Sequence, residues 1–195
     1  MVRGTGNPDD LIKRASLLRH DSVHGEFGGT IRVNKENSSL IINGNEVFVI
    51  ESDNPSKIDY KKYGIKKATV VDNTGVWRDE EGLKQHTRNP SVEQVILTAP
   101  GKGKVKNIVF GINDEKVKSD DKILAAASCT TNAIAPVLKL VDDNFKIVNG
   151  HIETVHAYTN DQNLIDNYHP SDRRGRSAAL NLSLIHISEP TRLSV

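Results

Sequence analysis

Four short apolar runs in the middle of the chain do most to limit its possible folds. They cover residues 68–71, 94–98, 107–112 and 123–127. Runs of this length and composition are typical of strands buried on both faces of a parallel sheet. A helical pattern over residues 79–86 lies between the first two runs. The sequence therefore predicts an α/β fold whose main element is a doubly wound, Rossmann-type sheet.

The first third of the chain predicts a helix followed by a small group of strands. Residues 9–19 carry apolar side chains at helical spacing after Pro8, so a helix is expected to begin near Asp9 or Asp10. Short strands are expected at residues 30–33, 40–42 and 46–50. Asn43 and Gly44 separate the last two strands and are a strong signal for a tight hairpin.

Three polar turns follow the predicted parallel strands. They contain Asn73, Thr74 and Gly75, then Thr98, and finally Cys129. Ligands of doubly wound sheets bind outside the carboxyl ends of the strands. We therefore expect the ligand site of this chain at these three turns.

Cys129 is the chain's only cysteine, and it lies between an apolar run and a second helical pattern. At a strand-to-helix junction, free backbone N–H groups and the positive end of the helix dipole favour the thiolate. Reactive cysteines in such places have pKa values of about 3.5 to 7.5, below the usual value of about 8.5. Ser128 and Thr130 add donors that suit a bound anion. A buried structural cysteine is the alternative, but the small polar neighbours favour a nucleophile.

His156 ends a segment in which apolar and polar residues alternate. The alternation over residues 152–156 predicts a strand that becomes polar at its end. A histidine that faces Cys129 could activate the thiol and then handle protons, and a positioned base is worth about 10²–10⁴-fold in rate. Taken alone, a histidine in such a position is more often an ordinary one with satisfied hydrogen bonds, and that alternative stays open here.

Composition excludes several classes of function. The net charge is +1, which gives no electrostatic case for nucleic-acid or membrane binding. No apolar run approaches the roughly 20 residues of a membrane span, and no signal peptide is recognisable. A single cysteine excludes an internal disulfide and suits a cytoplasmic protein. We assign no metal ligands.

Several motifs occur together in a fixed order. They are LLRHDSVHGEF (17–27), NTGVW (73–77), LTAPGKG (97–103), AASCTTN (126–132), TVHAYTNDQN (154–163) and DRRGRSAALN (172–181). In sequence and spacing they closely resemble the phosphorylating glyceraldehyde-3-phosphate dehydrogenases, most of all a bacterial subgroup. The resemblance covers about residues 8 to 182.

The resemblance implies a role for each matching residue. Cys129 would attack an aldehyde, and His156 would take the proton as hydride leaves for NAD. The groups that would hold the substrate's phosphate and the attacking phosphate are Ser128, Thr130, Thr159, Asp161 and Arg176. The groups near the cofactor's adenosine would be Asn73, Thr74, Gly75 and Thr98. Arg173 and Arg174 are expected in solvent or in subunit contacts.

The resemblance also implies a division of the chain. Residues 1–128 would form a partial dinucleotide-binding domain, and residues 129–182 the beginning of an α+β catalytic domain. No G-x-G-x-x-G follows an early strand, so we expect the glycine loop to be missing and Met1 to be an internal start. Residues 183–195 resemble the translation of a sequencing adapter more than a protein segment, and we expect a non-native tail.

The cofactor, substrates and partners follow from the same resemblance. NAD is the expected cofactor, glyceraldehyde 3-phosphate and inorganic phosphate are the expected substrates, and the intact protein would be a cytoplasmic homo-tetramer. No carboxylate stands near Arg3, where the family holds the ribose hydroxyls. NADP is therefore also possible, although Arg3 could simply be a solvated side chain.

Three alternatives remain open from the sequence. An erythrose-4-phosphate dehydrogenase would carry nearly the same motifs. A Cys–His acyl-transfer hydrolase would need a third orienting residue and no cofactor. A catalytically dead fragment would keep the motifs without the activity.

Overall fold

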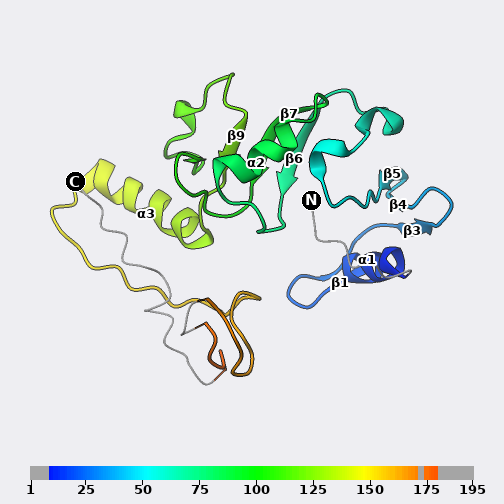
Figure 1. Cartoon of the computed structure of the whole chain (residues 1–195). Helices are drawn as coiled ribbons and strands as arrows, with labels where there is room; N and C mark the ends of the chain where they lie inside the picture. The colour runs from blue at the N-terminus through cyan, green and yellow to red at the C-terminus, as the bar shows by residue number, and fades with distance from the viewer. Residues whose placement is uncertain (1–8, 171–173, 180–195) are drawn as a thin grey trace. The chain divides into compact units, whose positions relative to one another are not determined.

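The computed structural model describes residues 9–170 and 174–179, which Figure 1 draws in colour. Contacts within the chain define two compact units, Met1–Asn144 and Phe145–Val195. Each unit is described by itself.

The core of the first unit is a four-stranded parallel sheet with strand order β6-β7-β9-β8. Its strands are β6 (Ala68–Asp72), β7 (Val92–Leu97), β8 (Lys106–Asn107) and β9 (Ile123–Ala125). Helix α2 (Glu80–Thr87) packs against this sheet, mainly against β7 (Figure 1). The predicted α/β class and the parallel sheet are confirmed.

Helix α2 forms where the sequence predicts it, because its start and its inner face are both specified. The Asp79 carboxylate caps the first turn by accepting a hydrogen bond from the Gly82 N–H. Leu83 and His86, three positions apart, are fully buried on the side that packs toward the sheet. Leu83 joins Val95 and Leu97 in the main apolar core. The helix therefore carries one polar group, His86, into the interior.

The expected helix and hairpin near the N-terminus are also present. They comprise α1 (Asp10–Arg19), β1 (His20–Asp21), β2 (Gly25–Glu26), β3 (Ile31–Asn34), β4 (Ser39–Ile42) and β5 (Asn45–Phe48). Strands β3, β4 and β5 form an antiparallel sheet, and α1 lies against β3 (Figure 1). Asn43 and Gly44 both have positive φ, +49° and +84°, which a two-residue hairpin turn of type I′ requires.

The predicted strand over residues 107–112 is wrong beyond its first residue. Strand β8 ends at Asn107, and the chain then turns. The Asn113 side chain accepts a hydrogen bond from the Val109 N–H and donates one to the Asn107 carbonyl. Gly111 has a φ of +76°, and Phe110 is 86% exposed. The apolar residues here therefore lie in a loop that asparagine and glycine specify.

Three short 3₁₀ helices and one long α-helix complete the first unit. The 3₁₀ helices are η1 (Pro55–Lys57), η2 (Tyr60–Tyr63) and η3 (Asp114–Lys116). Helix α3 runs from Cys129 to Phe145, so the helix predicted after Cys129 is confirmed. No helix in the described ranges is long and apolar enough to cross a membrane.

After Phe145, the last residue of α3, the second unit contains no helix or strand among its described residues. The strand predicted at residues 152–156 is therefore wrong for this structure, and Val155 is 99% exposed. A strand needs a neighbouring strand to pair with, and none of the strands in the described ranges pairs with this segment. Residues 159–178 instead fold into a loop that closes on itself, with the Asn163 N–H bonded to the Arg174 carbonyl and the Ala178 N–H bonded to the Asn163 carbonyl.

Candidate functional site

The turn after β6 is built on the Asp72 side chain. Its Oδ1 atom accepts hydrogen bonds from the backbone N–H and from the hydroxyl of Thr74, each 2.7 Å long. The Thr74 hydroxyl oxygen in turn accepts from the Val76 N–H at 3.1 Å. Gly75 has a φ of +66°, and a Cβ atom there would have no neighbour within 4 Å. The turn is thus fixed from below by Asp72 and open on its outer side.

The end of β7 is tied to the same turn. Thr98 donates its N–H to the Asp72 carbonyl at 3.1 Å, and its hydroxyl lies 2.6 Å from Asn73 Oδ1. All four residues predicted near the adenosine, Asn73, Thr74, Gly75 and Thr98, are therefore brought together within the first unit. Asn73, Gly75 and Thr98 are exposed, so their polar groups are available to a ligand.

Asp72 itself is completely buried, and its second carboxylate oxygen lies 3.1 Å from Nε2 of His86 on α2. Burial raises the pKa of the Asp72 carboxyl, but hydrogen bonds from His86 and Thr74 outweigh this effect and lower the pKa below its ordinary value. The carboxylate is therefore charged at neutral pH.

The turn before α3 places Cys129 at the first position of a 17-residue helix. The Ser128 hydroxyl oxygen accepts a hydrogen bond from the Thr131 N–H at 2.9 Å, which is the geometry of an N-cap. Cys129 is exposed and Thr130 is partly buried. The expected junction of strand, turn and helix at the cysteine is confirmed.

Two further contacts hold this turn in place. Ala127 is buried and has a φ of +58°, a left-handed conformation that is unusual for a residue with a Cβ atom. The Asn132 side chain donates to the Ala126 carbonyl at 2.7 Å and to the Ser128 carbonyl at 2.8 Å. The backbone around Cys129 is therefore bent sharply and is held by a side chain of the helix that follows.

His156 lies in the second unit and is partly buried. Its Nδ1 atom contacts the carbonyl oxygen of Ala157, so the proton sits on Nδ1 and is donated to that carbonyl. In the neutral imidazole this leaves the lone pair on Nε2, the form that a general base requires.

The predicted phosphate-binding residues of the second unit lie in the loop 159–178. The hydroxyl and the N–H of Thr159 both donate to the Gln162 side chain. Asp161 is ion-paired with Arg174. Arg176 is ion-paired with Asp166 at 2.7 Å, and Asp166 also accepts from the Ser177 N–H. The two arginines thus lie on one loop, each beside a carboxylate.

Sequence reasoning missed three residues of these sites. Arg174 was expected in solvent or subunit contacts, whereas it pairs with Asp161 in the folded loop. Asp72 directly follows the predicted strand over residues 68–71, and His86 ends the predicted helix over residues 79–86, but neither residue was assigned a role from the sequence. A carboxylate at the last position of a buried strand, next to a predicted ligand turn, was the available signal for Asp72. Arg3 and Arg173 lie outside the described residues.

No group of three or more His, Cys, Asp or Glu side chains in the described part of the chain could hold a metal ion.

Comparison with known proteins assigns the chain to a family. Residues 5–80 match the family model described as the NAD binding domain of glyceraldehyde 3-phosphate dehydrogenase, and residues 128–186 match the model of its C-terminal domain. The chain belongs to the glyceraldehyde-3-phosphate dehydrogenase family. The first match contains the turn at Asn73–Gly75, and the second begins at Ser128, directly before Cys129. NAD is the cofactor that the first domain is named for.

Individual relatives agree with the family models. A glyceraldehyde-3-phosphate dehydrogenase-like protein of Pseudomonas aeruginosa is 64% identical over 177 residues, which are 91% of this chain and 38% of that relative. The glyceraldehyde-3-phosphate dehydrogenase of Thermotoga maritima is 42% identical over 89% of this chain and 50% of its own length. A chloroplastic glyceraldehyde-3-phosphate dehydrogenase of Arabidopsis thaliana is 40% identical over 88% of this chain and 42% of its own length. The chain thus spans half or less of the length of these relatives.

Proposed function

We propose that the whole protein containing this segment is an NAD-dependent glyceraldehyde-3-phosphate dehydrogenase in which Cys129 is the nucleophile. The observation that carries this proposal is the position of Cys129, exposed at the first residue of α3 and preceded by the Ser128 cap. A thiol at a helix N-terminus is biased toward the thiolate by the dipole and by the first-turn N–H groups. The match of both family domains supports the same assignment.

The first step is attack of the Cys129 thiolate on the aldehyde carbon, which opens the C=O double bond and leaves an oxyanion; a proton from water then completes the thiohemiacetal. N–H groups at the start of α3 can stabilise the oxyanion that develops there. Nε2 of His156 then takes the proton of the thiohemiacetal hydroxyl, and a thioester remains on Cys129. NAD, when bound, accepts the hydride.

The second half of the reaction transfers the acyl group to inorganic phosphate. Attack of phosphate on the thioester carbon breaks the carbon–sulfur bond, releases an acyl phosphate and returns the Cys129 thiolate. Ser128 and Thr130 flank Cys129 in the sequence, so their hydroxyl and N–H groups are donors beside the thioester that Cys129 carries. Thr159, Arg174 and Arg176 are the groups of the loop 159–178 that can hold phosphate, with Asp161 and Asp166 orienting the two arginines.

The residues that would hold NAD in the described part are Asn73, Thr74, Gly75 and Thr98. They fit an adenosine because the turn is open outside Gly75 and offers side-chain amide and hydroxyl groups at a strand end. We expect the whole protein to form a homo-tetramer, as the sequence resemblance implies.

The test is a dehydrogenase assay on the whole protein, with glyceraldehyde 3-phosphate, NAD and phosphate. The wild type should form NADH only when phosphate or arsenate is present in steady state, and Cys129→Ser should remove the activity. Erythrose 4-phosphate in place of glyceraldehyde 3-phosphate compares three-carbon with four-carbon substrates. Full activity in Cys129→Ser would contradict the assignment of the nucleophile.

A further inference from the structure

Asp72 and His86 form a fully buried polar pair that the proposed reaction does not use. Both side chains have no exposed surface, and they come from different elements, the end of β6 and the last turn of α2. Burying a carboxylate is costly unless hydrogen bonds compensate for the lost water. Packing of the helix on the sheet could be achieved by apolar side chains, so packing alone does not explain this polar pair.

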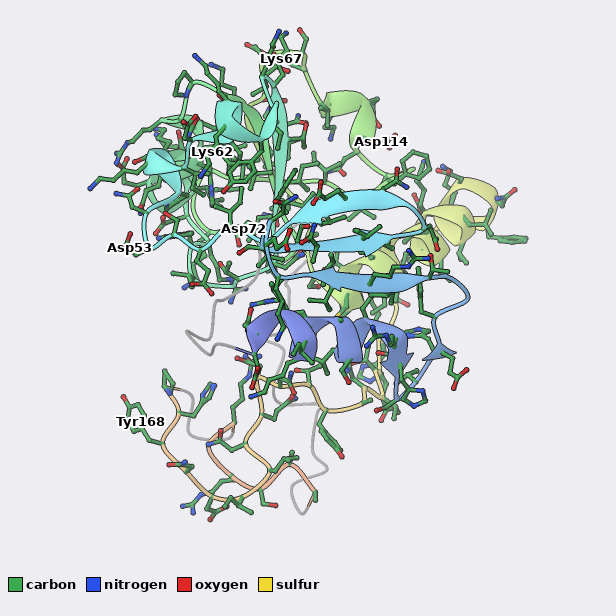
Figure 2. All side chains as sticks on the ribbon, turned by 90° about the vertical axis from the view of Figure 1, so that its right-hand side faces the viewer. Asp53, Lys62, Lys67, Asp72, Asp114 and Tyr168 are labelled. Atoms are coloured by element: carbon green, nitrogen blue, oxygen red, sulfur yellow. The ribbon has the colours of Figure 1, made fainter. Side chains whose placement is uncertain are left out.

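The hydrogen bonds of the Asp72 oxygen atoms lead to Thr74 and Thr98 at the proposed cofactor turn and to His86. Oδ1 accepts both hydrogen bonds of Thr74, and Oδ2 faces His86 Nε2. The backbone carbonyl accepts from the N–H of Thr98, whose hydroxyl reaches Asn73. Asp72, which Figure 2 labels, thus bonds two of the residues proposed to bind adenosine, Thr74 and Thr98, and reaches Asn73 through the Thr98 hydroxyl.

The surroundings of His86 fix which nitrogen carries its proton. Nδ1 is buried and has no hydrogen-bond partner within the described residues. A proton on Nδ1 would therefore be a buried donor without an acceptor, so the proton belongs on Nε2, which donates to Asp72. The ring is also held by Trp77, which meets it edge-on with the ring centroids 5.3 Å apart. His86 thus clamps one carboxylate oxygen and leaves the other directed at Thr74.

We propose that Asp72 is a positioning residue for the adenosine half of NAD, which it serves by shaping the turn of Asn73, Thr74 and Gly75, and that His86 fixes the orientation of its carboxylate. This inference rests on the proposed function, because it takes that turn as part of the cofactor site. Asp72 does not touch the cofactor, since its side chain is buried beneath the turn.

The first test separates cofactor binding from chemistry in the whole protein. Asp72→Asn keeps the size of the side chain but puts an N–H group opposite the His86 N–H. It should raise KM for NAD about tenfold, the effect of losing one hydrogen bond to a charged group, with kcat per folded enzyme nearly unchanged. Asp72→Glu keeps the charge and should recover part of the affinity. Asp121→Asn is the matched control, because Asp121 bonds Lys106 and Lys118 at the amino end of β9, opposite the cofactor edge.

The second test needs no cofactor. Amide hydrogen exchange at Thr74 and Val76 should be faster in Asp72→Asn and in His86→Gln than in the wild type, and unchanged in Asp121→Asn. If Asp72→Asn yields too little folded protein, Thr74→Val removes one of the two bonds to Asp72 without touching the buried pair. In this variant the readout is exchange of the amide at position 74, which should be faster than in the wild type; KM is not used, because Thr74 is itself proposed to contact NAD.

The outcomes distinguish this inference from a purely structural role and from the proposed function. A variant that loses folded protein but keeps the wild-type KM for NAD and wild-type exchange at Thr74 would overturn the positioning role. A wild-type protein with no dehydrogenase activity would overturn the proposed function instead, while the exchange measurement would still decide whether Asp72 shapes the turn.

Discussion

The turn after β6 and the loop 159–178 both arrange polar side chains, but they do so with different amounts of burial. At the turn, Asp72 and His86 are completely buried, and the Asp72 carboxylate bonds both His86 and Thr74. In the loop, the carboxylates of Asp161 and Asp166 are 57% and 59% exposed, and Figure 2 shows Tyr168 of the same loop directed outward. Buried pairs resist rearrangement, whereas exposed ion pairs contribute little and exchange readily with water.

The difference suits the two ligands that we propose. An adenosine needs a turn of fixed shape, because flat rings and hydroxyls are recognised by geometry. A phosphate site needs a cationic side chain that can exchange its carboxylate partner for the bound phosphate. Arg174 and Arg176 can do this, since each is held by an exposed carboxylate and can turn toward a bound phosphate. The first unit therefore provides rigidity, and the second provides adaptable charge.

The largest effect is expected at His156, in the second unit. His156→Asn removes the proposed base and should lower kcat of the whole protein by about 10²–10⁴-fold. His151→Asn, an exposed histidine of the same segment, is the matched control and should be close to wild type. A decrease of less than threefold in His156→Asn would contradict the assignment of His156 as the base.

The second-largest effect is a loss of stability, and it should be larger for the buried partner of Asp72, His86, than for the exposed partner of Asp166, Arg176. His86→Ala should lower the free energy of unfolding of the chain by about 3 kcal/mol or more, because a hydrogen bond to a charged group is lost and a cavity remains. Arg176→Ala also removes the partner of an aspartate, Asp166, but at the surface, and should hardly change the urea midpoint. Equal decreases in the urea midpoint of the two variants would contradict the claim that the buried pair stabilises the chain more than the exposed one.

The pH dependence of stability should sharpen the same contrast. The pKa of Asp72 is lowered in the folded state, so its contribution to stability is present above the ordinary carboxyl pKa and is lost as pH falls through the lowered value. The difference in Tm between wild type and Asp72→Asn should therefore be largest near neutral pH and shrink at acid pH. A difference that grows on acidification would mean that the carboxylate is not the stabilised form.

The smallest effects are expected at two backbone positions with positive φ. Ala127 is buried next to Cys129 in the first unit, and Lys146 is exposed at the start of the second. Ala127→Val should destabilise the chain by about 1–3 kcal/mol, because a β-branched residue fits this conformation poorly. Lys146→Gly should stabilise it by up to about 1 kcal/mol, because glycine adopts a positive φ without strain. Thermal unfolding of both variants measures the two effects.

The elements that the sequence predicted well are those with strong local signals. The helices beginning at Asp10, Glu80 and Cys129 are specified by apolar periodicity, and two of them by a capping side chain as well. The hairpin at Asn43 and Gly44 follows from turn chemistry. The meeting of the turns after β6 and β7 could be predicted, because residues at the carboxyl ends of parallel strands lie at one edge of the sheet. Their role in binding a cofactor stays a prediction.

The errors occurred where structure depends on distant partners. Residues 107–112 are apolar enough for a strand, but the Asn113 side chain and Gly111 end the pairing. Residues 152–156 alternate like a strand but find no neighbouring strand among the described residues. Asp72 and His86 are 14 positions apart and lie on different elements, and no local sequence pattern predicts a contact of that kind. The pairing of Cys129 with His156 stays a prediction.

The rate of alkylation of Cys129 tests the central claim most directly. Cys129 is the only cysteine of this chain, so iodoacetamide reports on one site. At pH 7 the folded chain should react about tenfold faster than a model peptide thiol, because a thiol at a helix N-terminus has a larger thiolate fraction. The advantage should disappear in urea, where the helix is lost. A folded-state rate equal to that of the peptide would contradict the assignment of Cys129 as an activated nucleophile.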